Sequence, residues 1–121
     1  EHGVEALGNS IDRNIRLAQY LEKRVKNEDL LVSLAPTPLN INCFRFVPNL
    51  NLDDAKLDAL NEEIVILIQE RGIAVPSTTK INNQLAIRIN ITNHRTQESD
   101  LDILIQAILD IGQELTKNKT L

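Results

Sequence analysis

Residues 85–96 read LAIRINITNHRT, and side chains alternate along the first eight of them more cleanly than anywhere else in the chain. One side of the alternation carries Leu85, Ile87, Ile89 and Ile91, and the other carries Ala86, Arg88, Asn90 and Thr92. Such a period of two is typical of a β-strand with one face on the core. We therefore predict a strand over residues 84–92 whose aliphatic face lies under helices.

Arg88 is placed by this alternation in the middle of the predicted strand, facing away from the aliphatic set. A planar guanidinium on rigid backbone suits two-pronged binding of a carboxylate or a phosphate. Periodicity alone also allows two simpler roles, because charged residues are common on half-exposed strands. Arg88 could pair with an acidic side chain across the sheet, or it could point into water.

Three amphipathic helices are predicted from apolar residues at three-and-four spacing. The first runs from Val4 to about Asn27. The second begins at Asp53 or Asp54 and ends at Gly72, which suits a left-handed stop. The third covers about residues 99–116 and opens on Ser99 and Asp102 in a capping-box-like arrangement. The apolar stripes are Val4, Leu7, Ile11, Ile15, Ala18, Leu21 and Val25; then Leu57, Leu60, Ile64, Leu67 and Ile68; and then Leu101, Leu104, Ile105, Ile108, Ile111 and Leu115.

Three further strands are predicted over residues 30–35, 40–47 and 73–79. Asn82 and Asn83 tolerate the positive φ angles of a tight hairpin before the strand at residues 84–92. The facing of residues 40–47 is ambiguous, since Cys43 lies on one side and Phe44 on the other. Short connections favour an α+β fold with a small, mostly antiparallel sheet of about four strands and helices on one face. Residues 1–121 are predicted to form one domain.

Composition limits the possible partners. The net charge is −4 and no long basic run occurs, so neither nucleic acid nor an anionic membrane is an expected partner. The longest apolar run, residues 64–68, is far shorter than the ~20 residues of a membrane span. These features favour a cytoplasmic protein. Cys43 is the one cysteine, which excludes an internal disulfide and suggests a thiol buried in the core.

Several features occur in an order that resembles the carboxy-terminal part of the group II pyridoxal-phosphate-dependent amino-acid decarboxylases. They are Gly3-Val4-Glu5-Ala6-Leu7, Cys43-Phe44-Arg45, Gly72, Val75-Pro76-Ser77-Thr78-Thr79, LAIRINITNHRT and an Asp-rich start to the last helix. The family includes aromatic-amino-acid, glutamate and diaminobutyrate decarboxylases. The resemblance implies the small domain of an aminotransferase-like fold, a homodimeric parent enzyme, and a large cofactor-binding domain upstream of residue 1. It also implies that Arg88 binds the carboxylate of an amino-acid substrate.

The chemistry of pyridoxal phosphate needs a lysine that binds the cofactor covalently, which the family places after a histidine. Here Gly3 follows His2 and Arg95 follows His94, so neither position supplies the pair. Lys56 and Lys80 are expected to face solvent, and His94 and Arg95 are expected to be solvated turn residues. We assign no catalytic, cofactor-binding or metal-binding residue, and expect no pyridoxal phosphate on this chain alone.

Two hypotheses follow. In the first, the chain is the small domain of a homodimeric decarboxylase, inactive alone, whose uncovered sheet face docks on the large domain. The absence of methionine and the start at Glu1 lead us to expect an excised or processed piece. In the second, it is a free-standing ferredoxin-like domain that binds a small ligand or another protein through the same face.

Overall fold

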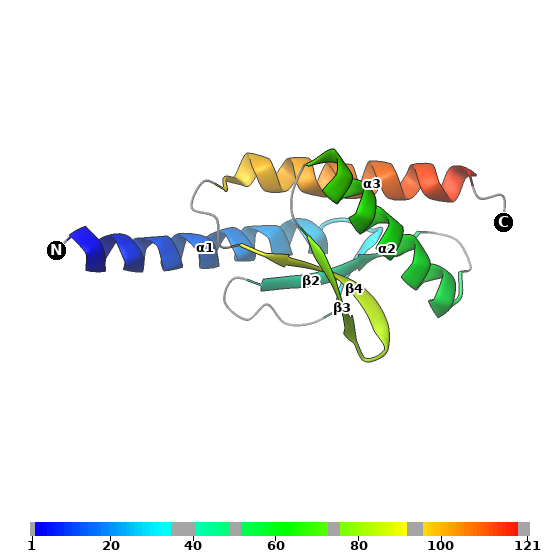
Figure 1. Cartoon of the computed structure of the whole chain (residues 1–121), viewed down its shortest axis with the longest axis horizontal. Coiled ribbons are helices and arrows are strands. Elements are labelled where there is room, and N and C mark those ends of the chain that lie inside the picture. The colour runs from blue at the N-terminus through cyan, green and yellow to red at the C-terminus, as the bar shows by residue number, and fades with distance from the viewer. Residues whose placement is uncertain (1, 35–40, 49–51, 73–75, 92–95, 119–121) are drawn as a thin grey trace.

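The computed structural model describes residues 2–34, 41–48, 52–72, 76–91 and 96–118. Three helices and four strands follow one another along the chain (Figure 1). They are α1 (His2–Lys26), β1 (Leu31–Ser33), β2 (Ile41–Phe46), α2 (Asp54–Arg71), β3 (Ser77–Ile81), β4 (Gln84–Asn90) and α3 (Glu98–Asn118). This is the order of elements that the sequence predicts.

The four strands form one open sheet in the order β1-β2-β4-β3, and every neighbouring pair is antiparallel. β4 therefore lies in the interior of the sheet between β2 and β3. Asn82 and Asn83, with φ angles of 52° and 66°, form the predicted tight turn between β3 and β4. The predicted α+β class, with a small antiparallel sheet, is confirmed.

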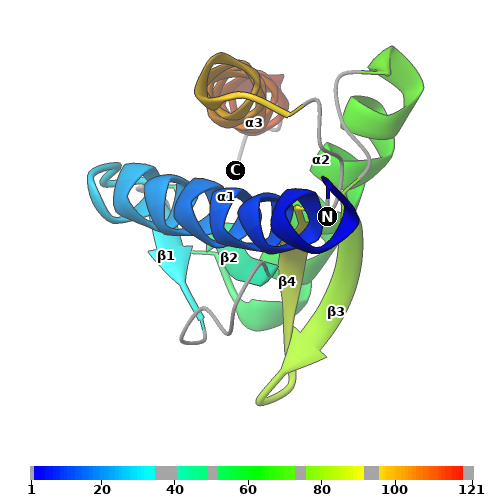
Figure 2. The same ribbon diagram turned by 90° about the vertical axis from the view of Figure 1, so that its left-hand side faces the viewer.

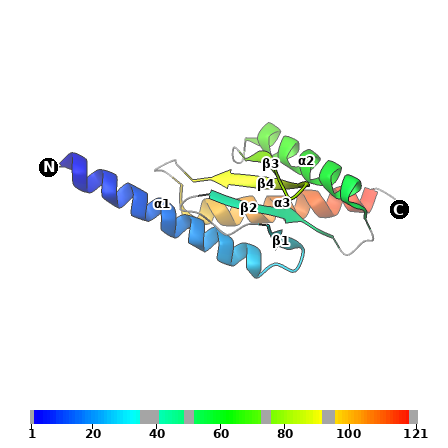
Figure 3. The same ribbon diagram turned by 90° about the horizontal axis from the view of Figure 1, so that it is seen from below.

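All three helices lie on one side of the sheet, as Figures 1 and 2 show. We call the opposite side the outer face; Figure 3 looks onto it. The core lies between the helices and the sheet and is built almost entirely from aliphatic side chains. Each helix contributes residues of its predicted stripe, including the buried Leu21, Ile64 and Ile108. α1 is also held to β2 by the Asn42 side chain, which donates a hydrogen bond to the Ala18 carbonyl oxygen at 3.1 Å.

The ends of α2 follow the predicted signals. The Asp53 carboxylate accepts a hydrogen bond from the Lys56 amide at 2.8 Å, and Gly72 ends the helix with a φ angle of 67°. α3 begins at Glu98, one residue before the predicted start, but the predicted capping pair of Ser99 and Asp102 is wrong. The Gln97 amide donates to the Asp100 carboxylate at 2.8 Å, which is the back-bonding half of a capping box. Asp102 instead accepts a bond from α1.

α1 is longer than the sheet that it covers, and its first turns project beyond the other elements (Figures 1 and 3). Its second half is joined to α3 by polar contacts: the Tyr20 hydroxyl donates to Asp102 at 2.7 Å and the Arg24 Nε donates to the same oxygen at 3.0 Å. None of the helices in the described ranges has the length and apolarity to cross a membrane.

Candidate functional site

Arg88 lies at the centre of the outer face. Its Cα partner across β2 is Cys43, and its partner across β3 is Ser77, so these three residues form a row across the sheet. Ile87 and Ile89, on either side of Arg88 in the chain, are buried in the core. The predicted facing of Arg88 away from the aliphatic core is therefore confirmed.

The Arg88 side chain is half-buried rather than freely exposed. Among the residues that the structure describes, it shares no ion pair with an acidic group, although four such pairs join other residues. The described part of the chain therefore gives no support to the simpler role in which Arg88 pairs with an acidic side chain across the sheet. A half-buried guanidinium between the small side chains of Cys43 and Ser77 can bind a carboxylate through two parallel hydrogen bonds.

Cys43 is half-exposed on the outer face, so the prediction of a thiol buried in the core is wrong. The reason is the facing of β2, which the sequence left open. Phe44 and Phe46 are at most 1% exposed and turn toward the helices, which leaves Cys43 on the opposite side. Partial burial raises the pKa of the Cys43 thiol, and the positive charge of Arg88 acts in the opposite direction. The thiol and the guanidinium therefore interact electrostatically across the row.

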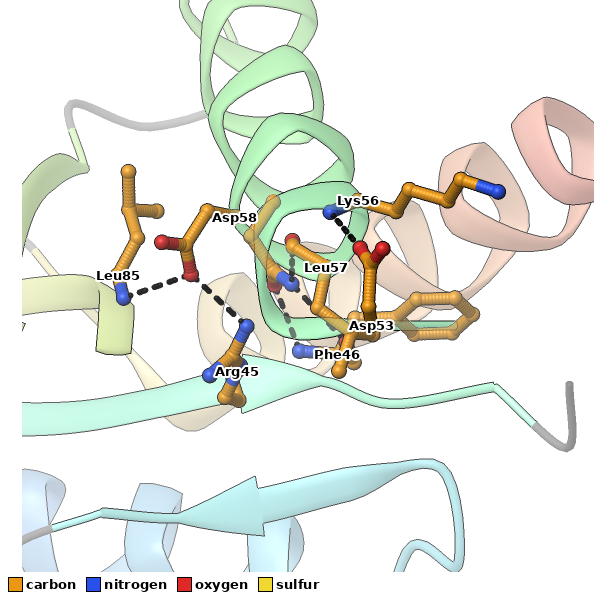
Figure 4. Close-up of polar contacts among 8 residues, drawn as sticks. Arg45, Phe46, Asp53, Lys56, Leu57, Asp58 and Leu85 are labelled. Carbon is orange, nitrogen blue, oxygen red and sulfur yellow. Dashed lines mark hydrogen bonds and ion pairs between the residues drawn. The ribbon is translucent and has the colours of Figure 1, made fainter. Parts of the chain in front are cut away.

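A second polar group lies where β2 and β4 separate. Arg45 is only 2% exposed, and its Nη2 donates to the Asp58 carboxylate of α2 at 3.0 Å. The same carboxylate oxygen accepts a hydrogen bond from the Leu85 amide of β4, also at 3.0 Å. Figure 4 shows Asp58 between the two donors. One acidic side chain thus joins β2, β4 and α2.

Asn61, one turn after Asp58, is fully buried and bonds to the backbone of β2. It accepts a hydrogen bond from the Phe46 amide at 2.7 Å and donates one to the Phe46 carbonyl oxygen at 3.0 Å. Sequence reasoning identified neither Asp58 nor Asn61. The available signal was the position of Asn61 beside Leu60 and Ile64 in an otherwise apolar helix face, because a polar residue there must find partners.

The other residues considered at the sequence level lie apart from this row. Lys56 on α2 and Lys80 on β3 are both exposed, as expected. His94 and Arg95 lie outside the described residues, so their predicted place in a solvated turn stays a prediction. In the described part of the chain, Arg88, Cys43 and Ser77 form a row on the outer face, and Asp58 bridges Arg45 and the Leu85 amide where the pairing of β2 with β4 ends.

The fold and this site define a small α+β domain with an arginine on the sheet face opposite the helices. The sequence of the chain is also similar to that of known enzymes. Over 114 residues, 94% of the chain, it is 27% identical to an aromatic-L-amino-acid decarboxylase of Bacillus atrophaeus. No protein-family model matches the chain.

Solved structures of decarboxylases contain the same fold. The glutamate decarboxylase domain of the diaminobutyrate-pyruvate transaminase and L-2,4-diaminobutyrate decarboxylase from Vibrio parahaemolyticus superposes with a TM-score of 0.83 at 26% identity, over 94% of this chain and 24% of that one. Oryza sativa TDC with PLP and tryptamine has the same fold, with a TM-score of 0.84 at 18% identity, over 93% of this chain and 24% of that one.

The homologues of this chain are group II pyridoxal-phosphate-dependent amino-acid decarboxylases, and the region that matches is their carboxy-terminal part. The chain spans about a quarter of the length of these relatives. The resemblance inferred from the sequence is thereby confirmed. The alternative of a free-standing ferredoxin-like domain is not favoured, because nearly the whole chain aligns within much larger enzymes.

Proposed function

We propose that this chain is the carboxy-terminal small domain of a pyridoxal-phosphate-dependent amino-acid decarboxylase and that Arg88 binds a carboxylate of the substrate. The observation that carries the proposal is the half-buried Arg88, without an acidic partner in the described residues, on the sheet face that no helix covers. The alignment of 94% of the chain with decarboxylases supports the choice of reaction. The outer face would then pack against a larger cofactor-binding domain of the same polypeptide.

The described residues do not fit pyridoxal phosphate by themselves. Lys56 and Lys80 are exposed on separate elements, and neither is among the cross-strand partners of Arg88. The lysine and the phosphate-binding groups would therefore belong to the larger domain, and we derive no step of the reaction through the cofactor. The chain alone is proposed to be inactive. Addition of pyridoxal phosphate followed by borohydride should leave no single lysine of the 121-residue chain stoichiometrically modified; such an adduct would contradict this proposal.

Arg88 would contribute by positioning. Two hydrogen bonds from a guanidinium hold a carboxylate in one orientation, which lowers the entropic cost of reaching the reactive geometry. Equal stabilisation of bound substrate and transition state would lower KM without raising kcat. A tight grip on the departing carboxylate would favour the bound substrate over the transition state. Where a substrate carries two carboxylates, this argument favours binding of the distal one over the one that leaves.

The test compares Arg88→Lys with Arg71→Lys in the full-length enzyme, using carbon dioxide release from L-glutamate, L-2,4-diaminobutyrate and L-tryptophan. Arg71 is exposed at the end of α2 and undergoes the same chemical change. Lysine keeps the charge but loses the planar fork, so Arg88→Lys should raise KM for the best substrate about tenfold. Arg71→Lys should leave it unchanged. Identical kinetics for the two variants would contradict a substrate-binding role for Arg88.

We further propose that the parent enzyme is a homodimer, as the resemblance implies, and that it is cytoplasmic, as the composition favours. Its oligomeric state can be measured by light scattering after gel filtration of the full-length protein. A monomeric active enzyme would contradict the dimer.

A further inference from the structure

We infer that Asp58 is a positioning residue for Arg88. The inference rests on the proposed substrate-binding role of Arg88 and extends it to a residue that contacts neither substrate nor cofactor. Asp58 lies on α2, one of the helices on the side of the sheet opposite the outer face. Its effect would pass through the backbone of β4, on which Arg88 is carried.

The hydrogen-bonded ladder between β2 and β4 is short. Its paired residues run from Ile41 and Asn90 to Phe44 and Ile87, and the pairing stops there. The last pair lies directly beside the pair of Cys43 and Arg88. Any fraying of the ladder from this open end would therefore reach Arg88 within one residue.

Asp58 occupies the open end. One of its carboxylate oxygens accepts from the Leu85 amide on β4 and from the Arg45 guanidinium on β2, each at 3.0 Å. These two bonds replace strand pairing just beyond the last residue pair and hold β4 at a fixed distance from β2 (Figure 4). A charge-assisted hydrogen bond is about twice as strong as a neutral one, which suits a carboxylate to this position.

The position of the Arg45 side chain depends on its ion pair with Asp58. Arg45 is 2% exposed, and among the described residues its Nε has no hydrogen-bond partner. Asp58 supplies the acceptor for Nη2, with an exposed fraction of 22% for its own side chain. A buried charge that loses its counter-ion must move toward water or another partner. Loss of the Asp58 charge would thus displace Arg45, open the end of the ladder and change the direction of the Arg88 side chain.

The experiment is a double-mutant cycle in the full-length enzyme with the substrates named above. Asp58→Asn should raise KM for the best substrate about tenfold, because displacements of ~1 Å in a positioning group have effects up to ~100-fold. In the Arg88→Lys background the same substitution should change KM less than about twofold, since two changes acting through one group are not additive. Asp54→Asn, at an exposed acid one turn earlier in α2, makes the same charge change and should leave KM unchanged.

A purely structural role predicts a different pattern. Ile105→Val removes one methyl group from the buried face of α3, changes no hydrogen bond or charge, and serves as the control for a loss of stability alone. If Asp58→Asn lowers Tm but leaves KM at the value of this control, or if its effect on KM is fully retained in the Arg88→Lys background, the inference is wrong. If Arg88→Lys alone leaves KM unchanged, the proposed function fails first.

If the Asp58→Asn enzyme does not fold, the KM of Asp58→Glu provides the test. It keeps the charge for Arg45 but moves the carboxylate by one methylene relative to the Leu85 amide. The inference is supported if Asp58→Glu raises KM at least about threefold in the wild-type background but not in the Arg88→Lys background. An unchanged KM overturns it.

Discussion

Asn61 takes the place of a neighbouring strand at Phe46. The ladder between β2 and β4 has already ended at Phe44, yet the amide and the carbonyl of Phe46 are both hydrogen-bonded, because the Asn61 side-chain amide accepts from one and donates to the other. Its Nδ2 also donates to the Leu57 carbonyl oxygen at 2.8 Å. A helix side chain therefore satisfies backbone groups that would otherwise be buried without partners.

We predict that Asn61→Leu destabilises the domain strongly. Leucine has a similar size but leaves both backbone groups of Phe46 buried and unpaired, each at a cost of about 1–3 kcal/mol. The free energy of unfolding from urea titration of the 121-residue chain should fall by about 2–6 kcal/mol. Glu62→Ala, at the exposed next position, should change it by less than about 0.5 kcal/mol. Equal effects of the two substitutions would contradict the bonding described for Asn61.

Local signals explain which parts of the fold were predictable. Alternation fixed the facing of Ile87 and Arg88, the residues Asn82 and Asn83 fixed the hairpin, and Gly72 fixed the end of α2. Each of these depends on a few consecutive residues and on the backbone angles that they allow. Residues 73–75 of the strand predicted over 73–79 lie outside the described residues; β3 runs from Ser77 to Ile81, two residues past the predicted end, because pairing with β4 rather than apolar content sets its limit.

Long-range partners were not predictable. Arg45 meets Asp58, 13 residues away, and Tyr20 meets Asp102, 82 residues away, and no local pattern selects either pair. Cys43 was misplaced for a related reason. Both sides of β2 carry apolar residues, so only the packing of Phe44 and Phe46 under the helices decides which side is outer. Arg88 was found because its neighbours in sequence gave its facing and the family resemblance suggested a role.

Gly112 provides a second test of the core. A Cβ at this position of α3 would lie 2.7 Å from Cε2 and Cζ of the buried Phe46 ring. Alanine favours a helix by about 1 kcal/mol over glycine, but overpacking a core costs about 1–3 kcal/mol. Gly112→Ala should therefore lower the free energy of unfolding by about 1–2 kcal/mol. In a Phe46→Leu background, where the ring is absent, the same change should be neutral or stabilising; a loss of the same size there would exclude the ring contact as its cause.

Tyr20 should titrate above its ordinary pKa of 10.0, because its hydroxyl donates a hydrogen bond to the Asp102 carboxylate and that bond favours the neutral phenol. It is the one tyrosine, and the chain has no tryptophan, so phenolate absorbance reports it directly. The folded pKa is raised, so the stabilisation is complete below pH 10 and is lost as the pH rises through the folded pKa. Asp102→Asn should move the midpoint back down. An unshifted midpoint in the wild-type chain would contradict the bond.

The relation between Cys43 and Arg88 can be measured without substrate. Burial raises the pKa of the Cys43 thiol above its ordinary 9.0, and the guanidinium of Arg88 limits that rise. Only the thiolate reacts with iodoacetamide, so the alkylation rate below the pKa follows the thiolate fraction. Arg88→Gln removes the positive charge and should shift the pH profile of alkylation to higher pH. Arg88→Lys should shift it less, because the charge is kept.

Arg71→Gln is the matched control for this experiment, since it removes the same charge from an exposed site at the end of α2. Its profile should coincide with that of the wild-type chain, because Arg71 is exposed to water and is not among the charges that shift the pKa of Cys43. Cys43 is the one cysteine, so the reaction needs no separation from other thiols. If Arg88→Gln and Arg71→Gln give the same profile, the guanidinium of Arg88 does not lie beside the thiol, and the row across the outer face is incorrect.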